Sequence, residues 1–246
     1  MSPVPGQDAS STARVAVIIP TLNEEASIGA VVSALPRDVV DQIIVADGGS
    51  TDQTTERAHR AGATVISAGR GFGRACLLGA QAASSSDIVV FMDGDGADDP
   101  DFIAALVTPI RAERCDFVIA SRARGQYQPG SISIHQLAAG HIVGWLIWLL
   151  YGVRYSDMCT FRAIRRDTLL KLGMHELSYG WNLEMQMRIA RSGLRILELP
   201  VPYRCRIGGE SKVAGSLKGT LVAGYRIVVT FARVALQRMS VKGQLQ

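Results

Sequence analysis

The chain of 246 residues contains few cysteines, and its first residues lack the pattern of a signal peptide. Its four cysteines are widely and irregularly spaced, so they match neither a disulfide framework nor a metal-binding repeat and suit a reducing cytosol. Residues 1–13 have neither the basic start nor the apolar core of a signal peptide, and we expect this Pro-, Ser- and Gly-rich stretch to be disordered. No nucleic-acid-binding motif is present, so we expect no nucleic-acid partner.

Basic residues are scarce in the first part of the chain, and acidic residues are scarce in the second. Residues 1–110 contain 6 Lys and Arg against 14 Asp and Glu, a net charge of −8, whereas residues 111–246 contain 20 against 8, a net charge of +12. An acidic first part suits a metal ion, and a basic second part suits an anionic lipid or a membrane surface.

Short apolar runs alternate with helical patterns along the first hundred residues. The runs predict strands at residues 15–19, 42–46, 64–67 and 88–92. Helices are expected between them, the first capped by Thr21 or Asn23. This alternation predicts an α/β fold with a Rossmann-like, mostly parallel sheet flanked by helices. Ligands of such sheets bind at the carboxyl ends of the strands, where the sequence has three acid-bearing loops. These loops are residues 21–24, 47–52 and 93–99.

Asp93 and Asp95 directly follow the fourth apolar run, separated by one glycine. If strand alternation continues here, both carboxylates face the same side and repel each other by roughly 1–4 kcal/mol at about 4 Å. A divalent cation relieves this repulsion. Carboxylate oxygens suit Mg²⁺ or Mn²⁺, which would keep open positions for the phosphates of a nucleotide. The alternative is an ordinary acidic turn, because Asp and Gly are common turn residues.

Further stretches in the same order resemble the family 2 inverting glycosyltransferases, and especially their dolichyl- and polyprenyl-phosphate mannosyl- or glucosyltransferases. They are Val17-Ile-Ile-Pro-Thr-Leu-Asn-Glu-Glu25, Val45-Ala-Asp-Gly-Gly-Ser-Thr-Asp52, Phe91-Met-Asp-Gly-Asp95, Ala120-Ser-Arg122, Ser156-Asp-Met-Cys-Thr-Phe-Arg-Ala163, and Val201-Pro-Tyr-Arg204 leading into Gly208-Gly-Glu-Ser-Lys212. Each motif is weak alone, but the ordered set is specific. The resemblance implies the A-type glycosyltransferase fold, with residues 14–215 as the catalytic domain.

The resemblance also implies which residues bind the donor, a nucleoside-diphosphate sugar. Asp93 and Asp95 would hold Mg²⁺ or Mn²⁺ at the diphosphate, which makes Asp95 a catalytic candidate as well. The stretch Gly69-Arg-Gly-Phe-Gly73 precedes a predicted helix and lies near the donor in the family, so Arg70 is expected to contact phosphate, with Arg74 as a second candidate. Its spacing does not match an NAD-binding fingerprint. The other expected donor-binding residues are Pro20, Thr21, Glu24 and Asp47.

The acceptor decides what chemistry the protein must supply. A lipid phosphate is already an anion near neutral pH and needs cations to hold it, and Arg122 and Arg162 in family motifs carry guanidinium groups that fit phosphate oxygens. The resemblance places Asp157 and Glu184 near the acceptor, as a base or as groups that orient a cation. These four residues are catalytic candidates for hexose transfer to a polyprenyl or dolichyl phosphate. In the alternative, the acceptor is a soluble sugar or small-molecule hydroxyl, and Glu184 or Asp157 is the base.

Two departures from the family pattern leave the sugar open. Gly48 stands where many relatives have a second Asp, and Ala97 stands where lipid-phosphate mannosyltransferases often have Gln. The sequence therefore does not separate UDP-glucose from GDP-mannose as the donor.

Two later segments favour a membrane-bound acceptor. Residues 137–153 are nearly all apolar and include Trp145 and Trp148, which predicts a helix in the membrane interface; a buried core helix and a membrane span are the alternatives. Residues 216–246 predict a basic amphipathic helix suited to an anionic membrane. Packing against the protein core or a second subunit is the alternative, so a homo-oligomer stays open. We expect a peripheral protein at the cytoplasmic membrane face.

Overall fold

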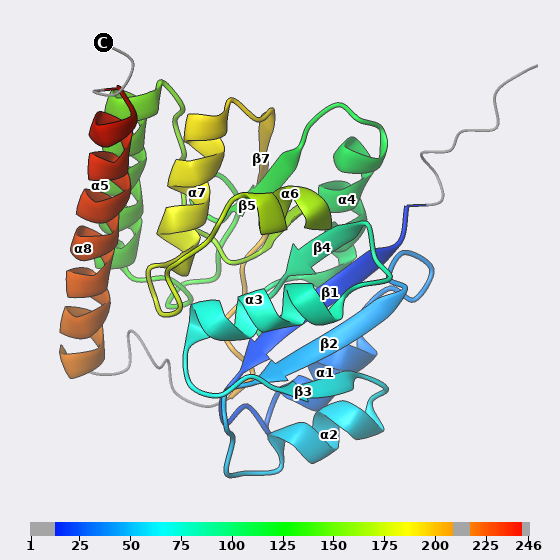
Figure 1. Cartoon of the computed structure of the whole chain (residues 1–246). Helices are drawn as coiled ribbons and strands as arrows, with labels where there is room; N and C mark the ends of the chain where they lie inside the picture. Colours follow the sequence, from blue (N-terminus) through cyan, green and yellow to red (C-terminus); the bar gives the residue numbers. More distant parts are fainter. Residues whose placement is uncertain (1–12, 209–216, 243–246) are drawn as a thin grey trace, which may run out of the picture.

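The computed structural model describes residues 13–208 and 217–242, in which seven strands form one sheet (Figure 1). The strand order is β3-β2-β1-β4-β6-β5-β7. The first four strands run parallel, β6 is antiparallel to both of its neighbours, and β7 is parallel to β5. The strands are β1 (Val15–Thr21), β2 (Gln42–Asp47), β3 (Thr64–Ser67), β4 (Ile88–Phe91), β5 (Phe117–Ser121), β6 (Arg162–Arg165) and β7 (Ile196–Pro200). The predicted mostly parallel α/β sheet is confirmed.

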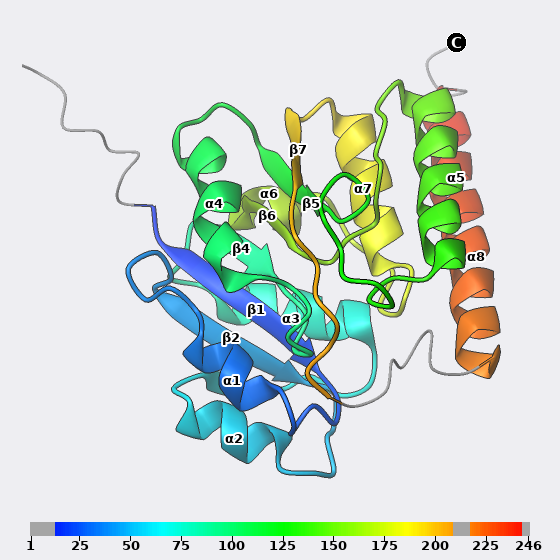
Figure 2. The same ribbon diagram turned by 180° about the vertical axis from the view of Figure 1, so that it is seen from behind.

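Helices cover both faces of the sheet (Figures 1 and 2). One face packs against α1 (Ile28–Ser33), α2 (Thr54–Arg60) and α4 (Ile103–Arg111), which follows a short 3₁₀ turn, η2 (Pro100–Phe102). The other face packs against the remaining helices, which share a second apolar cluster. These are α3 (Phe72–Ala82), α5 (Ile134–Tyr151), α6 (Arg166–Lys171), α7 (Trp181–Ser192) and α8 (Leu217–Lys242). Because the central strands are covered on both sides, they are continuous apolar runs such as Val15–Ile19.

The first strand-to-helix connection differs from the prediction. The residue before α1 is Ser27, and neither Thr21 nor Asn23 caps the helix. Asn23 has φ +53, and its side-chain oxygen accepts a hydrogen bond from the Thr51 N–H, 2.9 Å away. The asparagine therefore ties the loop after β1 to the loop after β2. The capping pattern considers only neighbouring residues, so it could not reveal this contact across 28 residues of sequence.

The apolar segment predicted over residues 137–153 is the helix α5. A capping box of Ser133 and Gln136 starts the helix, and Gly152, with φ +75, ends it. No helix in the described parts of the chain combines the length and apolar character needed to span a bilayer. The helix α8 packs on α7 and buries Thr230 and Val234. The predicted disordered stretch, apart from Ala13, and most of the Gly208–Lys212 motif lie outside the described residues.

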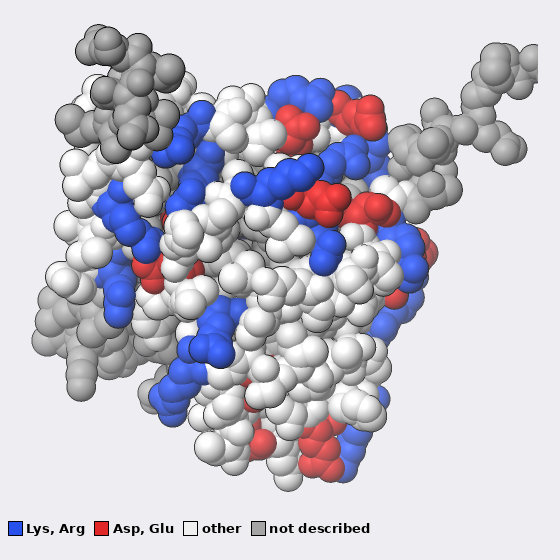
Figure 3. All heavy atoms as spheres, in the orientation of Figure 1, with Lys and Arg blue, Asp and Glu red and all other residues white. Residues whose placement is uncertain are grey.

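Basic side chains predominate on the face of the molecule that Figure 3 shows. The helix α5 contains no charged residue, and α8 contains five basic and no acidic residues. Both helices lie at the same end of the molecule, away from α1 and α2 (Figure 1). The four cysteines are free thiols, three of them buried.

Candidate active site

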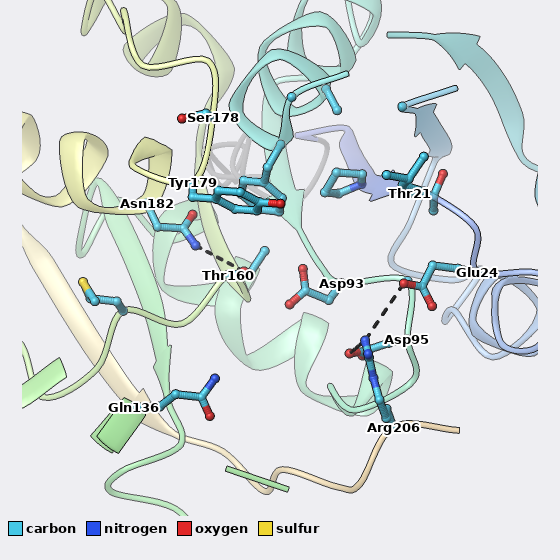
Figure 4. A pocket seen from close by; sticks show the side chains of 18 of the residues that line it. Thr21, Glu24, Asp93, Asp95, Gln136, Thr160, Ser178, Tyr179, Asn182 and Arg206 are labelled. Atoms are coloured by element: carbon cyan, nitrogen blue, oxygen red, sulfur yellow. Dashed lines mark hydrogen bonds and ion pairs between the residues drawn. The ribbon is translucent and has the colours of Figure 1, made fainter. Parts of the chain in front are cut away.

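A cavity of about 650 Å³ lies at the carboxyl ends of the central strands (Figure 4). Figure 4 shows Asp93 near its centre, with Thr21 and Glu24 to one side and Thr160 and Asn182 to the other. We call the first side the β1 side; it is formed by Pro20, Thr21, Leu22, Glu24, Gly48 and Arg70. We call the second the α5 side; it is formed by Arg122, Gln136, Ala139, Gly140, Asp157, Met158, Thr160, Asn182 and Ile227.

Asp93 and Asp95 stand on a turn rather than on a strand. Because β4 ends at Phe91, the two carboxylates reach the cavity through the turn and not through strand alternation. The Ala97 N–H donates to Asp95 Oδ1 at 3.0 Å, and the Asp93 N–H donates to Asp98 Oδ2 at 3.2 Å. Burial first, and the Asp95 carboxylate second, raise the pKa of Asp93 to about 7. Burial and the charge of Asp93 raise the pKa of Asp98 well above its ordinary value.

Asp93 and Asp95 fit a divalent cation that brings further ligands of its own. Burial and the charge of Asp95 make the ionised form of Asp93 unfavourable, and a bound cation would relieve this. Within residues 13–208 and 217–242, no group of three or more His, Cys, Asp or Glu could hold a metal ion. Two carboxylates leave most coordination positions to phosphate oxygens and water, which is how Mg²⁺ is usually bound at phosphates.

Arg206 is a residue of the cavity that the sequence did not predict. Its Nη2 lies 2.8 Å from Asp95 Oδ2 and 4.0 Å from Glu24 Oε1 (Figure 4). Its other terminal nitrogen is buried without a hydrogen-bond partner in the described structure. A guanidinium with a spare donor beside two carboxylates is suited to an incoming anion. The available signal was the second arginine of Tyr203-Arg-Cys-Arg206, directly before the Gly208 motif.

Apart from the predicted metal ligands, five residues were predicted to bind the donor. Four of them line the cavity, namely Pro20, Thr21, Glu24 and Arg70. Thr21 is 5% exposed, and its Oγ1 has no hydrogen-bond partner among the described residues. A buried hydroxyl without a partner is costly, so a ligand atom is the expected partner. Asp47, the fifth residue, is not part of the wall. Its carboxylate accepts the N–H groups of Gly49 and Ser50, each at 2.9 Å, and so shapes the loop that brings Gly48 to the cavity.

On the α5 side, Arg122 and Asp157 form a bidentate ion pair. Arg122 Nε and Nη2 lie 2.8 Å from Asp157 Oδ2 and Oδ1, and the N–H groups of Arg122 and Met158 also donate to this carboxylate. Burial alone would raise the pKa of Asp157, but the bonds from Arg122 outweigh it and hold the pKa below its ordinary value. The Arg122 guanidinium also lies over the Tyr203 ring, 5.0 Å from its centre. Both predicted residues therefore reach the cavity as a pair.

The structure does not bring Arg162 and Glu184 to the cavity wall. Arg162 is fully buried and donates to the backbone carbonyls of Cys159, Thr160 and Asn182. Glu184 is also fully buried and accepts from the N–H groups of His175 and Glu176 and from Arg188. These positions leave no described contact of Arg162 with the cavity. Of the two roles predicted for Glu184, base or group that orients a cation, its contacts to Arg188 and Arg233 match the second. Each is held by local partners that the sequence motif does not reveal.

The helix α5 packs closely against the backbone of residues 155–157, and Gly144 is what permits the closest approach. A Cβ on Gly144 would collide with the Tyr155 carbonyl, and one on Gly140 would come within 3.9 Å of the Asp157 backbone. The wall here is completed by Ala139 of α5 and Ile227 of α8, both without polar side-chain atoms. This side of the cavity is therefore partly apolar.

Several lining residues were missed because their signals are weak. Asn182 donates to Thr160 Oγ1 at 3.2 Å, and Gln136 and Tyr179 also face the cavity (Figure 4). Thr160 stands inside the Ser156–Ala163 motif, and Asn182 stands two residues before Glu184. Polar residues of this kind are common on any surface, so only the fold identifies them as part of a site.

Comparison with known proteins identifies the family. The model of glycosyl transferase family 2 matches residues 16–173. The chain belongs to glycosyltransferase family 2. An uncharacterized glycosyltransferase of Mycobacterium tuberculosis is 35% identical over 212 residues, which cover 85% of this chain and 94% of that protein. The undecaprenyl-phosphate mannosyltransferase of Micrococcus luteus is 31% identical over 228 residues, covering 85% of this chain and 91% of the relative.

Solved structures agree with this assignment. The glucosyl-3-phosphoglycerate synthase of Mycobacterium tuberculosis, in complex with Mn²⁺, UDP-glucose and phosphoglyceric acid, superposes with a TM-score of 0.73 and 25% identity. The match covers 94% of this chain and 85% of that chain. The protein is thus a glycosyltransferase with the A-type fold, as the sequence motifs predicted.

Proposed function

We propose that this glycosyltransferase transfers a hexose, with inversion, from a nucleoside-diphosphate sugar to a polyprenyl or dolichyl phosphate at the cytoplasmic face of a membrane. The observation that carries the proposal is the state of Asp157. Among the described residues it is the one carboxylate that lines the α5 side, and four N–H groups already occupy it. An acceptor that is already an anion needs no protein base, whereas a hydroxyl does.

The β1 side supplies what the donor needs. The Thr21 hydroxyl is free to bind the donor, and Arg70 and Arg206 are cations for its diphosphate. Asp93 and Asp95 would hold Mg²⁺ or Mn²⁺, which supplies Lewis-acid stabilisation of the leaving diphosphate. The relative complexes with Mn²⁺ and UDP-glucose support this reading. Asp47 does not line the cavity, and Gly48 has no side chain with which to contact the nucleobase of the donor. The nucleobase therefore stays open between uracil and guanine.

The α5 side supplies a place for the acceptor phosphate. Its oxygen would attack the sugar C1 on the face opposite the diphosphate, forming a new C–O bond while the bond to the diphosphate breaks. Arg122, fixed by Asp157 and Tyr203, keeps its charge beside this path. Because Arg162 and Glu184 lie behind the wall, we assign them the task of holding the backbone around residues 157–160 and 174–177 in place.

The helices α5 and α8 support a membrane-bound acceptor. Both line the cavity, through Ala139 and Ile227, and both carry large apolar side chains on their outer surface. We call these side chains the apolar face: Ile142, Trp145, Trp148 and Leu149 of α5, and Tyr225, Val228, Val229 and Leu236 of α8, all 39–67% exposed. Exposed tryptophans on a helix without charges, beside a helix whose charges are all basic, suit the interface of an anionic membrane.

The direct test is sugar transfer into lipid. Purified protein receives Mn²⁺ or Mg²⁺, polyprenyl phosphate and a panel of labelled nucleotide sugars that includes UDP-glucose and GDP-mannose. We expect metal-dependent label in the organic extract from one donor, and no label with Asp95→Asn. Metal-dependent nucleotide binding without any lipid product would contradict the lipid acceptor while leaving the donor site intact.

A soluble acceptor is the second candidate, because the synthase structure with 25% identity holds phosphoglyceric acid. Under this alternative, Asp157 or Glu184 is the base for a hydroxyl. The same panel therefore includes phosphoglyceric acid and simple sugars. Label in a water-soluble product that disappears with Asp157→Asn or Glu184→Gln, at unchanged nucleotide affinity, would favour this candidate.

A further inference from the structure

Glu176 lies where three parts of the molecule meet. It belongs to the loop between α6 and α7 and is 6% exposed. Its Oε1 accepts hydrogen bonds from the N–H and hydroxyl of Ser178, and its Oε2 accepts one from the Thr230 hydroxyl of α8 at 3.0 Å. Burial alone would raise the pKa of Glu176, but these bonds and the charge of Arg233 outweigh it and hold the pKa below its ordinary value.

A second buried carboxylate strengthens the same junction. Glu184 Oε2 accepts from the N–H groups of His175 and Glu176, at 3.0 and 2.6 Å, so α7 fixes the start of the loop. Arg233 of α8 lies 3.5 Å from a Glu176 oxygen and 3.6 Å from a Glu184 oxygen. One arginine of α8 therefore bridges the loop and α7.

The far side of this loop packs against the glycine-rich stretch at Arg70. The Arg74 N–H donates to the Leu177 carbonyl at 3.0 Å. A Cβ at Gly71 or Gly73 would collide with the backbone of residues 176–177, so the two segments touch backbone to backbone. Ser178 and Tyr179 from one segment, and Arg70 and Phe72 from the other, then form one continuous wall of the cavity.

We propose that Thr230 and Arg233 of α8 are positioning residues which, through Glu176, set the place of this wall and couple the docking of α8 to nucleotide binding. The inference rests on the donor half of the proposed function. Neither residue lines the cavity, and the one described residue of α8 that does, Ile227, lies on the α5 side, so we expect their effect on the nucleotide to pass through the loop. Because coupling between two sites is reciprocal, a nucleotide that tightens the wall must also tighten the docking of α8.

The first experiment compares Thr230→Val with Thr230→Ser in the full chain. Valine keeps the volume and removes the hydroxyl donor, whereas serine keeps the donor. Nucleotide affinity is measured by calorimetry with Mn²⁺ and UDP or GDP as the probe. Hydrogen exchange is followed in peptides covering residues 174–180 and 224–237, with and without the nucleotide.

In the wild-type protein, nucleotide binding is expected to slow exchange in both peptides. Thr230→Val is expected to weaken nucleotide affinity about 5-fold or more and to abolish the slowing in α8, while Thr230→Ser behaves like the wild type. Protection of residues 174–180 without any change in α8, or normal affinity in Thr230→Val, would overturn the inference. If no nucleotide binds, the donor assignment fails and the coupling fails with it. Faster exchange of residues 174–180 in Thr230→Val than in Thr230→Ser would then still support the positioning of the loop by Thr230, and equal rates would refute it.

A steric variant tests the same junction without removing a hydrogen-bonding group. A Cβ on Gly180, whose φ of −77° suits any residue, would collide with the Thr230 side chain. Gly224→Ala is the control. Gly224 lies on α8, like Thr230, and a Cβ on it would meet nothing within 4 Å. We expect Gly180→Ala to weaken nucleotide binding and to speed exchange in α8, and Gly224→Ala to do neither. Equal nucleotide affinity in the two variants would contradict the coupling.

Discussion

The carboxylates at the turn after β4 and the carboxylate on the α5 side of the cavity are in opposite states. At the turn after β4, burial and the neighbouring carboxylates raise the pKa values of Asp93 and Asp98. On the α5 side, Asp157 has a lowered pKa and is occupied by Arg122. The first arrangement leaves negative charge for a bound cation to neutralise. The second leaves no free carboxylate among the described residues of the α5 side to act as a base, and this combination suits a metal-bound donor and an anionic acceptor.

The largest effect is expected from Asp93→Asn. We expect transfer to fall by about 10²–10⁴-fold, because the amide is a weaker ligand for the cation that stabilises the leaving diphosphate. The free energy of unfolding in metal-free buffer at pH 7 should not fall, since a carboxyl with a raised pKa disfavours the fold once it ionises. Thermal unfolding and initial rates check both. A marked loss of stability would mean that Asp93 is a structural group.

The opposite behaviour is expected for Asp157→Ala. Removing this partner leaves Arg122 buried and unpaired, which typically costs about 3–5 kcal/mol of stability. The control is Glu56→Ala, which breaks the exposed Arg60–Glu56 pair of α2 and should cost less than about 1 kcal/mol. Denaturant unfolding measures both values. Similar small losses in the two variants would show that the Arg122–Asp157 pair is not a rigid part of the site.

A smaller effect is expected from Trp145→Ser combined with Trp148→Ser. The two rings are 53% and 48% exposed, so their loss removes apolar area available to a membrane but little from the core. At about 25 cal/mol per Å² of apolar area, we expect binding to anionic vesicles to fall roughly 10-fold or more, with nucleotide affinity unchanged. Co-sedimentation with vesicles checks the first quantity. Unchanged sedimentation would exclude the apolar face of α5 as the membrane contact.

The smallest effect is expected from Thr21→Val. This change removes one hydroxyl that we assign to the donor, and a single neutral hydrogen bond contributes about 0.5–1.5 kcal/mol, or about 2–13-fold in nucleotide affinity. Thr21→Ser keeps the hydroxyl and should bind like the wild type. Equal affinity of the valine and serine variants would remove Thr21 from the donor site.

The two sides also differ in how far the sequence predicts them. On the β1 side and at the turn after β4, strand ends carry their polar residues directly behind apolar runs, so local patterns located the loops of Thr21, Glu24 and Asp93. The family resemblance supplied the donor-binding roles of Thr21 and Glu24. Arg206 was not found in either way, because it reaches Asp95 across 111 residues of sequence. Its approach depends on how the segment after β7 returns over the sheet.

The α5 side is harder to predict because an arginine or glutamate in a motif has several possible partners. Arg162 was predicted to bind phosphate, but its guanidinium donates hydrogen bonds to backbone carbonyls instead. Glu184 looked like a base, yet loop N–H groups and arginines surround it. Only the packing of α7 and α8 decides these cases. The proposed membrane contact and any homo-oligomer stay predictions.

The most direct test of the account compares two acceptors that differ in one group. The wild-type protein is given Mn²⁺, the labelled nucleotide sugar that it uses, and either polyprenyl phosphate or the unphosphorylated polyprenol of the same chain length. Because the described residues of the α5 side offer no carboxylate other than the paired Asp157, we predict label in the lipid only when the phosphate is present. Comparable transfer to the bare polyprenol would contradict the account, since a hydroxyl would then be activated by a base that these residues do not provide.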